Sequence, residues 1–299
     1  MIIKYLCDKR AFNRVFRDLA HSRLTNAPEG AILIAKKDGP MFKRSSIVLC
    51  LAFLAVISSN PPRSSPQDLA PQLYLMGDFL VDASQAAAYE AALTELQASL
   101  AKHGFPVLFD TYSTDDSHYY IIYGLESFAG VDRWRAAWRE HAGKMGPDAF
   151  QAFRRRMAAA ELEWVYKFWY FRPDLSFLLE KERLKPEEIG YYTWDFVWLV
   201  PGAEAEFEAL NKEWIALSRS REALDPFMTY AGDLGTEGPV YCWFEYGKSA
   251  ADYAAAEEAF WKSMGDAGAD LSKRTRAVIR RLDTKTGRYR PDLSYAPRR

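Results

Sequence analysis

The sequence predicts an α+β fold in which one unit occurs twice in tandem. Three observations predict it. The segment Arg172–Ser176 reads Arg-Pro-Asp-Leu-Ser, and Arg290–Ser294 repeats these five residues 118 positions later. Each copy of the motif follows the same order of apolar and Ala-rich segments. The predicted strands are apolar on both faces, as expected for sheets that are covered on both sides.

Shorter matches recur in the same order along the two copies. They are Asp78-Phe79 with Asp195-Phe196, Phe109-x-Thr111-Tyr112 with Phe227-x-Thr229-Tyr230, Tyr123-Gly124 with Tyr246-Gly247, and Met145-Gly146 with Met264-Gly265. Their offsets run from 117 to 123, as expected if insertions fall in loops. We therefore predict a first repeat over 72–178, a linker over 179–190 and a second repeat over 191–299.

The first repeat reads as strand, helix, two strands, helix and strand. The predicted elements are strand 73–81, helix 84–103, strands 106–113 and 118–124, helices 127–142 and 147–161, and strand 163–171. Ser84 is a suitable helix N-cap and Gly104 a helix stop. Gly146-Pro147 breaks the second helical region, and Pro173 ends the last strand.

The second repeat follows the same order. The predicted elements are strand 191–200, helix 203–222, strands 225–232 and 239–246, helix 249–280 and strand 282–290. The order strand-helix-strand-strand-helix-strand is the ferredoxin-like split βαβ motif.

Alternation along the strands predicts how the repeats pack. Trp164, Tyr166, Phe168 and Tyr170 alternate with Val165, Lys167, Trp169 and Phe171 over 164–171, and 192–199 is similarly aromatic. Water-exposed faces of this kind would exceed the apolar patches that monomers tolerate, so we expect the two sheets to pack against each other.

At this point the chain resembles a tandem member of the dimeric α/β-barrel superfamily, similar to NIPSNAP-like and antibiotic-biosynthesis-monooxygenase-like proteins. The resemblance spans about 72–299 and rests on Tyr191-Tyr192-Thr193-Trp194 leading to Val200-Pro201-Gly202, and on 240–246 before an Ala-rich helix. It implies an intramolecular pseudo-dimeric α/β barrel whose interior holds a small molecule. Fold analogy alone does not give the chemistry.

The first 71 residues read as a targeting region. An apolar run over 47–57 follows Met41-Phe42-Lys43-Arg44 and is too short for a comfortable bilayer span. We expect 41–59 to be a signal peptide that starts at Met41, 1–40 to be a non-native upstream extension or disordered, and 60–71 to be a linker. A cytoplasmic segment with an anchor at 47–57 is the alternative. The expected location is periplasmic or secreted, with no stable membrane span after cleavage.

Charge and cysteine content exclude several functions. The formal net charge is −1, and no Lys/Arg stripe follows the leader, which argues against nucleic acid as a partner. Only Cys242 lies beyond the leader, and no Cys/His cluster has metal-binding spacing, so no metal is expected. The expected partner is a small-molecule ligand. The expected assembly is a monomer with an internal pseudo-dimer, and a homodimer is left open.

Asp78 and Asp195 are the candidate catalytic residues. Each lies in the middle of a predicted strand, and Asp195 stands among Trp194, Phe196 and Trp198. Aromatic surroundings would desolvate a carboxylate and raise its pKa, which suits proton transfer. The competing interpretation, which we favour, is that each accepts hydrogen bonds from a neighbouring loop or pairs with an arginine.

The candidate ligand-binding residues are aromatic strand residues, hydroxyl residues and two arginines. They are Trp164, Tyr166, Trp194, Trp198, Thr111, Thr229, Tyr112, Tyr230, Arg172 and Arg290. The arginines suit a bidentate anion clamp. We favour a structural interpretation for the threonines, for Tyr112 and Tyr230, and for the arginines. The threonines, Tyr112 and Tyr230 are then ordinary strand residues. The arginines belong to a motif that locks the chain after the last strand.

No cofactor is expected. Some relatives implied by the resemblance bind haem through a helix histidine, and His141 lies on a helix, but no other feature supports haem. The first functional hypothesis is an exported module that binds a small apolar or aromatic molecule between the repeats. The alternatives are a cofactor-independent oxygenase or isomerase with a strand Asp as base, and an assembly module without a cavity.

Overall fold

The computed structural model describes residues 72–297, so the predictions for 1–40, 41–59 and 60–71 lie outside the described residues. The first half contains β1 (Leu73–Val81), α2 (Ala86–His103), β2 (Asp110–Thr114), β3 (His118–Leu125), α3 (Gly130–Met145), α4 (Pro147–Ala160) and β4 (Glu161–Phe171). The second half contains β5 (Tyr191–Leu199), α5 (Glu204–Ser220), β6 (Met228–Gly232), β7 (Val240–Gly247), α6 (Ala250–Ala277) and β8 (Ile279–Tyr289).

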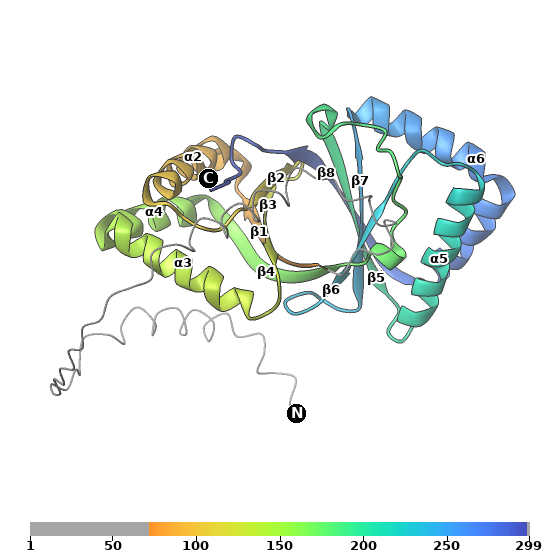
Figure 1. The fold of residues 1–299 in the computed structure, drawn as a ribbon, viewed down its shortest axis with the longest axis horizontal. Coiled ribbons are helices and arrows are strands. Elements are labelled where there is room, and N and C mark those ends of the chain that lie inside the picture. Colours follow the sequence, from red (N-terminus) through yellow and green to blue (C-terminus); the bar gives the residue numbers. More distant parts are fainter. Residues whose placement is uncertain (1–71, 298–299) are drawn as a thin grey trace, which may run out of the picture. The chain divides into compact units, whose positions relative to one another are not determined.

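The eight strands form one closed antiparallel barrel (Figure 1). Their order around it is β1-β3-β2-β8-β5-β7-β6-β4, so each half contributes four neighbouring strands. The halves join where β2 pairs with β8 and where β4 pairs with β6. The predicted sheet-to-sheet contact is therefore accompanied by hydrogen bonding at both edges, which leaves no open sheet edge.

Local sequence explains where most helices begin and end. α2 ends at Gly104, whose φ of 63° is in the left-handed region that glycine tolerates best. Gly146, with a φ of 90°, separates α3 from α4, and Pro147 begins α4. The prediction that Ser84 caps α2 is wrong, because Asp82 accepts from the Ser84 amide in a short 3-10 turn before α2 begins at Ala86.

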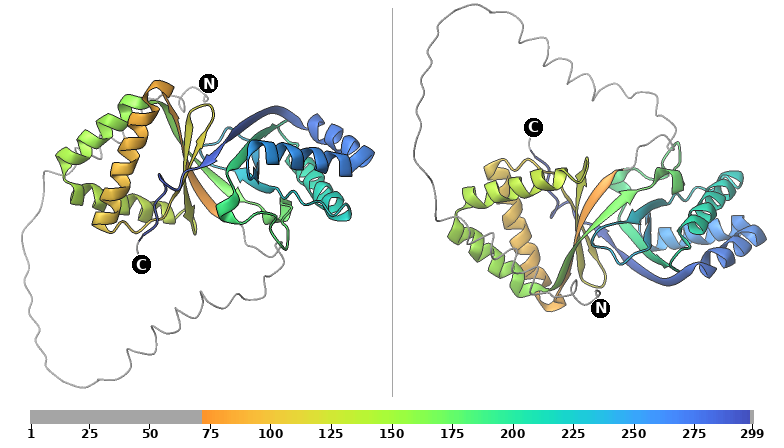
Figure 2. Two further views of the ribbon diagram at one scale, coloured as in Figure 1. Left: turned by 90° about the horizontal axis from the view of Figure 1, so that it is seen from above. Right: turned by 90° about the horizontal axis from the view of Figure 1, so that it is seen from below.

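Side-chain alternation produces three apolar clusters. The barrel interior contains Met76, Tyr120, Trp169, Tyr192, Trp194, Phe196, Val240, Cys242 and Tyr246. A second cluster lies between the first half of the barrel and α2, α3 and α4, and a third lies between the second half and α5 and α6. Figure 2 shows the two helical layers on opposite sides of the barrel. Aromatic side chains therefore line the barrel interior, where the resemblance implied a ligand.

The two Arg-Pro-Asp-Leu-Ser segments each pack on the opposite half. Leu175 and Phe177 follow β4 but belong to the core under α5 and α6. Leu293 and Tyr295 follow β8 but belong to the core under α2, α3 and α4. This exchange ties the halves together beyond the strand pairing.

Among residues 72–297, no helix combines the length and the apolar character that a membrane crossing requires.

Candidate functional site

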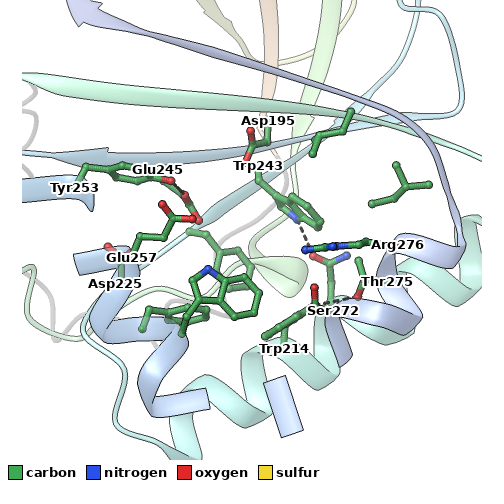
Figure 3. Close-up of a pocket in the computed structure, with 16 residues that line it drawn as sticks. Asp195, Trp214, Asp225, Trp243, Glu245, Tyr253, Glu257, Ser272, Thr275 and Arg276 are labelled. Atoms are coloured by element: carbon green, nitrogen blue, oxygen red, sulfur yellow. Dashed lines mark hydrogen bonds between the residues drawn. The ribbon is translucent and has the colours of Figure 1, made fainter. Parts of the chain in front are cut away.

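A pocket lies in the second half, between the barrel wall and the helices α5 and α6 (Figure 3). Its volume is about 230 Å³. Its lining comes from β5, β7, β8, α5, α6 and the loop before β6, and comprises Asp195, Asn211, Trp214, Asp225, Phe227, Trp243, Glu245, Tyr253, Glu257, Phe260, Trp261, Ser272, Thr275, Arg276, Ile279 and Leu282. Trp261 and Leu282 are exposed at its edge, so solvent reaches the pocket.

Strand register explains why Asp195 faces this pocket. On β5, Val197 and Leu199 belong to the core under α5 and α6, whereas Trp194 and Phe196 belong to the barrel interior. Asp195 has the parity of Val197, so it points toward the helices. The expectation that Trp194, Phe196 and Trp198 surround the Asp195 carboxyl is wrong, because successive side chains lie on opposite faces.

Two tryptophans of the pocket wall are fixed by hydrogen bonds. The Trp243 Nε1 donates to Asn211 Oδ1 at 2.9 Å, and the Trp214 Nε1 donates to Thr275 Oγ1 at 3.0 Å. Asn211 and Thr275 are buried, so they hold these ring edges in place. With the indole nitrogens satisfied inside the protein, the ring faces remain available to an apolar ligand.

Four carboxylic acids line the pocket: Asp195, Asp225, Glu245 and Glu257. Figure 3 shows them on one side, while Arg276 lies on the other. Asp195 Oδ1 accepts from Thr284 Oγ1 at 2.5 Å, and Glu245 Oε2 accepts from the Tyr253 hydroxyl at 2.5 Å. Burial and neighbouring acids oppose ionisation of such a group more than these two hydrogen bonds favour it.

The pKa values of three of these acids are raised. Burial, helped by the neighbouring Asp225, Asp195 and Glu257, raises the pKa of Glu245 to about 8 against the opposing effect of the hydrogen bond from Tyr253. Burial also raises the pKa of Asp225 to about 6 and raises that of Asp195. At neutral pH Glu245 is therefore protonated beside an acid with a lower pKa, an arrangement that suits acid–base chemistry.

The other predicted catalytic residue, Asp78, lies elsewhere. It points into one end of the barrel interior, where its carboxylate binds His118 Nδ1 and Lys167 Nζ, both at 2.6 Å. Burial opposes ionisation of Asp78, but the His118 hydrogen bond and the Lys167 charge outweigh it and lower its pKa. The prediction that the pKa of Asp78 is raised is wrong, and its partners are His118 of β3 and Lys167 of β4 rather than a loop or an arginine.

The prediction that Asp78 and Asp195 occupy matching positions is also wrong. Asp195 pairs with Trp243 of β7 and Thr284 of β8, and the residue of β1 with the corresponding neighbours is Gly77, which pairs with Ile121 and Tyr166. The Asp-Phe dipeptides match at an offset of 117, whereas β1 and β5 match at 118. A slip of one residue moves a strand side chain to the other face.

The structure divides the predicted aromatic ligand-binding residues between the two faces of the barrel wall. Tyr166 packs toward the first helical layer, and the ring of Trp164 contacts it at 5.8 Å between centroids. Trp194 and Trp198 point into the barrel, together with Tyr112 and Tyr230. Burial raises the pKa of the Tyr112 and Tyr230 hydroxyls. None of these six residues lines the pocket.

The predicted threonines and arginines serve the exchanged segments instead. Thr111 and Thr229 are fully buried and donate to the Leu293 and Leu175 carbonyls at 2.9 Å and 2.7 Å. Arg172 binds Glu208 and Asp174, and Arg290 binds Glu90 and Asp292. Because their donors are engaged by carboxylates, the prediction of an anion clamp is wrong. The structural interpretation is observed.

Sequence reasoning missed Glu245, Asp225, Tyr253 and the pocket tryptophans. One signal was available, since Glu245 is the only charged residue in Val240–Gly247, an otherwise apolar and aromatic strand. Asp225 and Tyr253 stand in the loop before β6 and in the first turn of α6, where charged and polar residues are ordinary. Their sequence positions therefore gave no indication of burial.

No protein-family model and no curated protein matches the sequence. Among solved structures, an anthrone oxidase-like protein superposes with a TM-score of 0.51 at 13% identity, over 76% of this chain and 94% of its own. A haem-binding protein from Thermus thermophilus superposes with a TM-score of 0.43 at 11% identity, over 77% and 96%. A chlorite dismutase from Candidatus Nitrospira defluvii gives 0.41 at 10% identity, over 74% and 92%. These neighbours have the dimeric α/β-barrel fold, as the resemblance implied.

The haem-binding neighbour contradicts the prediction that the protein has no cofactor. Neither the pocket lining nor the surroundings of His141 fit haem. The pocket lining contains no His, Cys or Met, and the Tyr253 hydroxyl already donates to Glu245. His141 is 2% exposed, with Phe105, Trp138 and His103 around its ring, so it presents no open face for axial ligation. Among residues 72–297, no cluster of His, Cys, Asp and Glu suits a metal ion.

Proposed function

We propose that this protein binds a small apolar or aromatic molecule in the pocket of the second half and transfers a proton on it. The observation that carries the proposal is the pocket itself, with tryptophan walls and two acids of raised pKa, Asp195 and Glu245, on one side. An anthrone oxidase-like protein has this fold, which supports the binding of a small molecule. The pocket takes the place of the barrel interior, where the sequence had suggested the ligand.

Asp195 is the proposed base. Thr284 occupies one of its carboxylate oxygens, and the other oxygen has no hydrogen-bond partner among the described residues. A raised pKa makes this carboxylate a stronger base than an exposed aspartate. Glu245, protonated at neutral pH in the ligand-free protein, is the proposed hydrogen-bonding partner of an oxygen or nitrogen of the ligand.

The assembly role remains a second candidate because of one observation. Aromatic side chains of both halves line the barrel interior, and Tyr112 of β2 contacts Tyr192 and Trp194 of β5 at 5.2 and 5.4 Å between ring centroids. Such contacts stabilise the joined halves. They explain the interior of the barrel but leave the pocket unexplained, so we place the ligand in the pocket.

The proposal also includes the repeat architecture of the chain. The order of elements supports two tandem ferredoxin-like repeats that form an intramolecular pseudo-dimer, and the barrel has the strand neighbours that this arrangement requires. A NIPSNAP-like affiliation, export through residues 41–59 and a monomeric mature chain stay predictions from the sequence.

The test uses 2-indanone, a neutral aromatic ketone with acidic methylene protons. The full protein is expected to accelerate exchange of these protons for deuterium, as followed by NMR. Asp195→Asn should lose most of this acceleration, because it removes the base, while Asp78→Asn should retain it, because Asp78 lies outside the pocket. Equal rates for Asp195→Asn and the native protein would remove Asp195 from the mechanism.

Binding is tested separately from turnover. Native mass spectrometry of the purified protein shows whether a small molecule remains bound, and its visible spectrum shows whether that molecule is haem. A bound aromatic molecule that Thr284→Tyr releases would support the pocket. A Soret band would overturn the conclusion that the tested residues do not fit haem.

A further inference from the structure

We propose that the ligand of the second-half pocket is an aromatic or apolar amine that binds as a cation. This inference rests on the proposed function and adds the chemical class of the ligand. It is carried by the geometry of the pocket: aromatic walls, and four acids that converge on the same side of an apolar cavity.

The charges around the pocket favour a cation at this side. Asp195, Asp225, Glu245 and Glu257 come from β5, the loop before β6, β7 and α6. Arg276 is the only basic residue of the lining, and it lies across the cavity from them. Opposite charges attract more strongly in a partly desolvated cavity than in water, so an ammonium group is favoured beside these acids.

One carboxyl oxygen of this group is buried without a partner among the described residues, and it is Asp225 Oδ1. Glu245 accepts at Oε2 from the Tyr253 hydroxyl. The charge of Arg183 acts on Asp225, but Arg183 Nη1 donates to Asp252 instead. A buried acceptor without a donor is costly, and an ammonium group brings three donors. An ammonium group in the pocket would therefore satisfy Asp225 Oδ1.

The aromatic side chains suit the rest of such a ligand. Trp214, Trp243 and Phe260 contribute aromatic walls to the pocket. Indole faces attract organic cations and bury apolar rings, so the same walls would accept the ring and part of the charge of an arylalkylamine. An anionic ligand would meet four acids, and a neutral ligand without a donor group would leave Asp225 Oδ1 unsatisfied.

The corresponding layer of the first half gives an internal control. Gly77 stands where β5 has Asp195, and Tyr123 of β3 stands where β7 has Glu245. No carboxylate occupies either position. The acid cluster is therefore a feature of the second-half pocket and not of the fold that both halves share. Acids that only stabilised the shared fold would be expected at these positions in both halves.

Binding of a cation should release a proton. Glu245 is protonated at pH 7, and the groups that face it are Asp195, Asp225, Glu257 and the Tyr253 hydroxyl, with Arg183 acting on Asp225. An ammonium group beside Glu245 favours its ionised form and lowers its pKa. Isothermal titration at pH 7 in two buffers of different ionisation enthalpy is therefore expected to show net proton release with the amine and none with a neutral analogue.

The deciding experiment compares three probes of one shape: 2-phenylethylamine, 2-phenylethanol and phenylacetate. Calorimetric titration of the full protein at pH 7 should give an affinity at least about tenfold higher for the amine than for the alcohol, with phenylacetate weakest. Glu245→Gln and Asp195→Asn should each reduce the ratio of amine affinity to alcohol affinity. Glu95→Gln, which changes an exposed acid of the first half, should leave all three affinities unchanged.

The outcomes separate this inference from the proposed function. Alcohol binding equal to or tighter than amine binding would overturn the amine assignment and leave a small-molecule pocket standing. Failure of all three probes to bind a folded protein, as judged by circular dichroism, would contradict the pocket and the amine together. An amine preference that survives both substitutions would place the cation elsewhere and overturn the assignment.

Discussion

The layer between barrel and helices differs sharply between the two halves. In the first half, Tyr166 lies over Gly77 so closely that a Cβ at Gly77 would approach its ring to 2.9 Å. Trp134 of α3 contacts Tyr123 and Tyr166, both at 5.5 Å between ring centroids. Aromatic rings therefore fill this layer, and the chain there has no space for an additional side chain at position 77.

In the second half, more polar residues occupy the corresponding positions. Asp195 replaces Gly77, Thr284 replaces Tyr166 and Glu245 replaces Tyr123, judged by their strand partners. The helix α6 then contributes Tyr253 and Glu257 to a cavity of about 230 Å³. The same scaffold thus holds a packed core on one side and a pocket on the other, and only a few side chains make the difference.

The largest expected effect on stability concerns the exchanged segments after β4 and β8, a feature that both halves share. Leu293→Ala and Leu175→Ala should each lower the free energy of unfolding by about 2–5 kcal/mol, because each removes a fully buried side chain from the opposite half's core. Urea denaturation measures both. Leu224→Ala, at a side chain that is 69% exposed, should cost less than about 0.5 kcal/mol. A loss in only one of the two core variants would show that the exchanged segments are not equivalent.

Asp78→Asn tests the buried charge of the first half. It removes the partner of Lys167 and weakens that of His118, so the protein should lose about 2–3 kcal/mol of stability at pH 7. Because the folded-state pKa of Asp78 is lowered, its contribution is present above the unfolded pKa of about 4 and is lost as the pH falls through the folded value. Stability measured from pH 3 to pH 7 should therefore rise less steeply in the variant. An unchanged profile would contradict the pairing.

Glu245→Gln tests an acid of the second half whose pKa is raised, whereas that of Asp78 is lowered. The folded-state pKa of about 8 lies above the ordinary value, so the unfolded chain binds fewer protons and stability falls as the pH rises from about 4.5 to about 8. The variant lacks this loss and should be more stable by about 1–2 kcal/mol at pH 8, after allowance for solvent in the open pocket. Thermal melts at pH 5 and pH 8 give the comparison. A variant destabilised equally at both pH values would show that Glu245 is ionised in the folded protein.

The smallest expected effect on stability belongs to the variant that makes the halves alike. Thr284→Tyr places in the second half the residue that Tyr166 supplies in the first, and its ring should fill the pocket. Affinity for 2-phenylethylamine should fall at least about tenfold, which is 1.4 kcal/mol, while the melting temperature changes little because Thr284 is exposed. The control is Tyr166→Phe, which should leave affinity unchanged. Undiminished binding by Thr284→Tyr would place the ligand elsewhere.

The order and type of the elements could be predicted from the sequence because each repeat alternates strand and helix patterns between clear Gly and Pro breaks. The break at Gly146-Pro147 and the stop at Gly104 are observed as predicted. Strand alternation over 164–171 was also predicted correctly. These features depend on local chemistry, which a single sequence carries.

The site depended on register and on contacts that local sequence does not carry. The Asp-Phe match made Asp78 the repeat equivalent of Asp195, but this alignment is shifted by one residue. A shift of one residue assigns a side chain to the wrong face of its strand. Thr111 and Arg290 looked like ligand groups because their partners, Leu293 and Glu90, lie far away in the sequence. Glu245 acquires its raised pKa from α6 and from neighbouring strands, and its sequence position says nothing of them.

The central claim is that the pocket of the second half is the ligand site. A crystal structure of the protein soaked with 2-phenylethylamine tests it most directly. We expect the phenyl ring to lie between Trp214 and Trp243 and the ammonium group to lie within hydrogen-bond distance of Glu245 or Asp225. Density for the amine inside the barrel, or at the helix layer of the first half, would contradict the account.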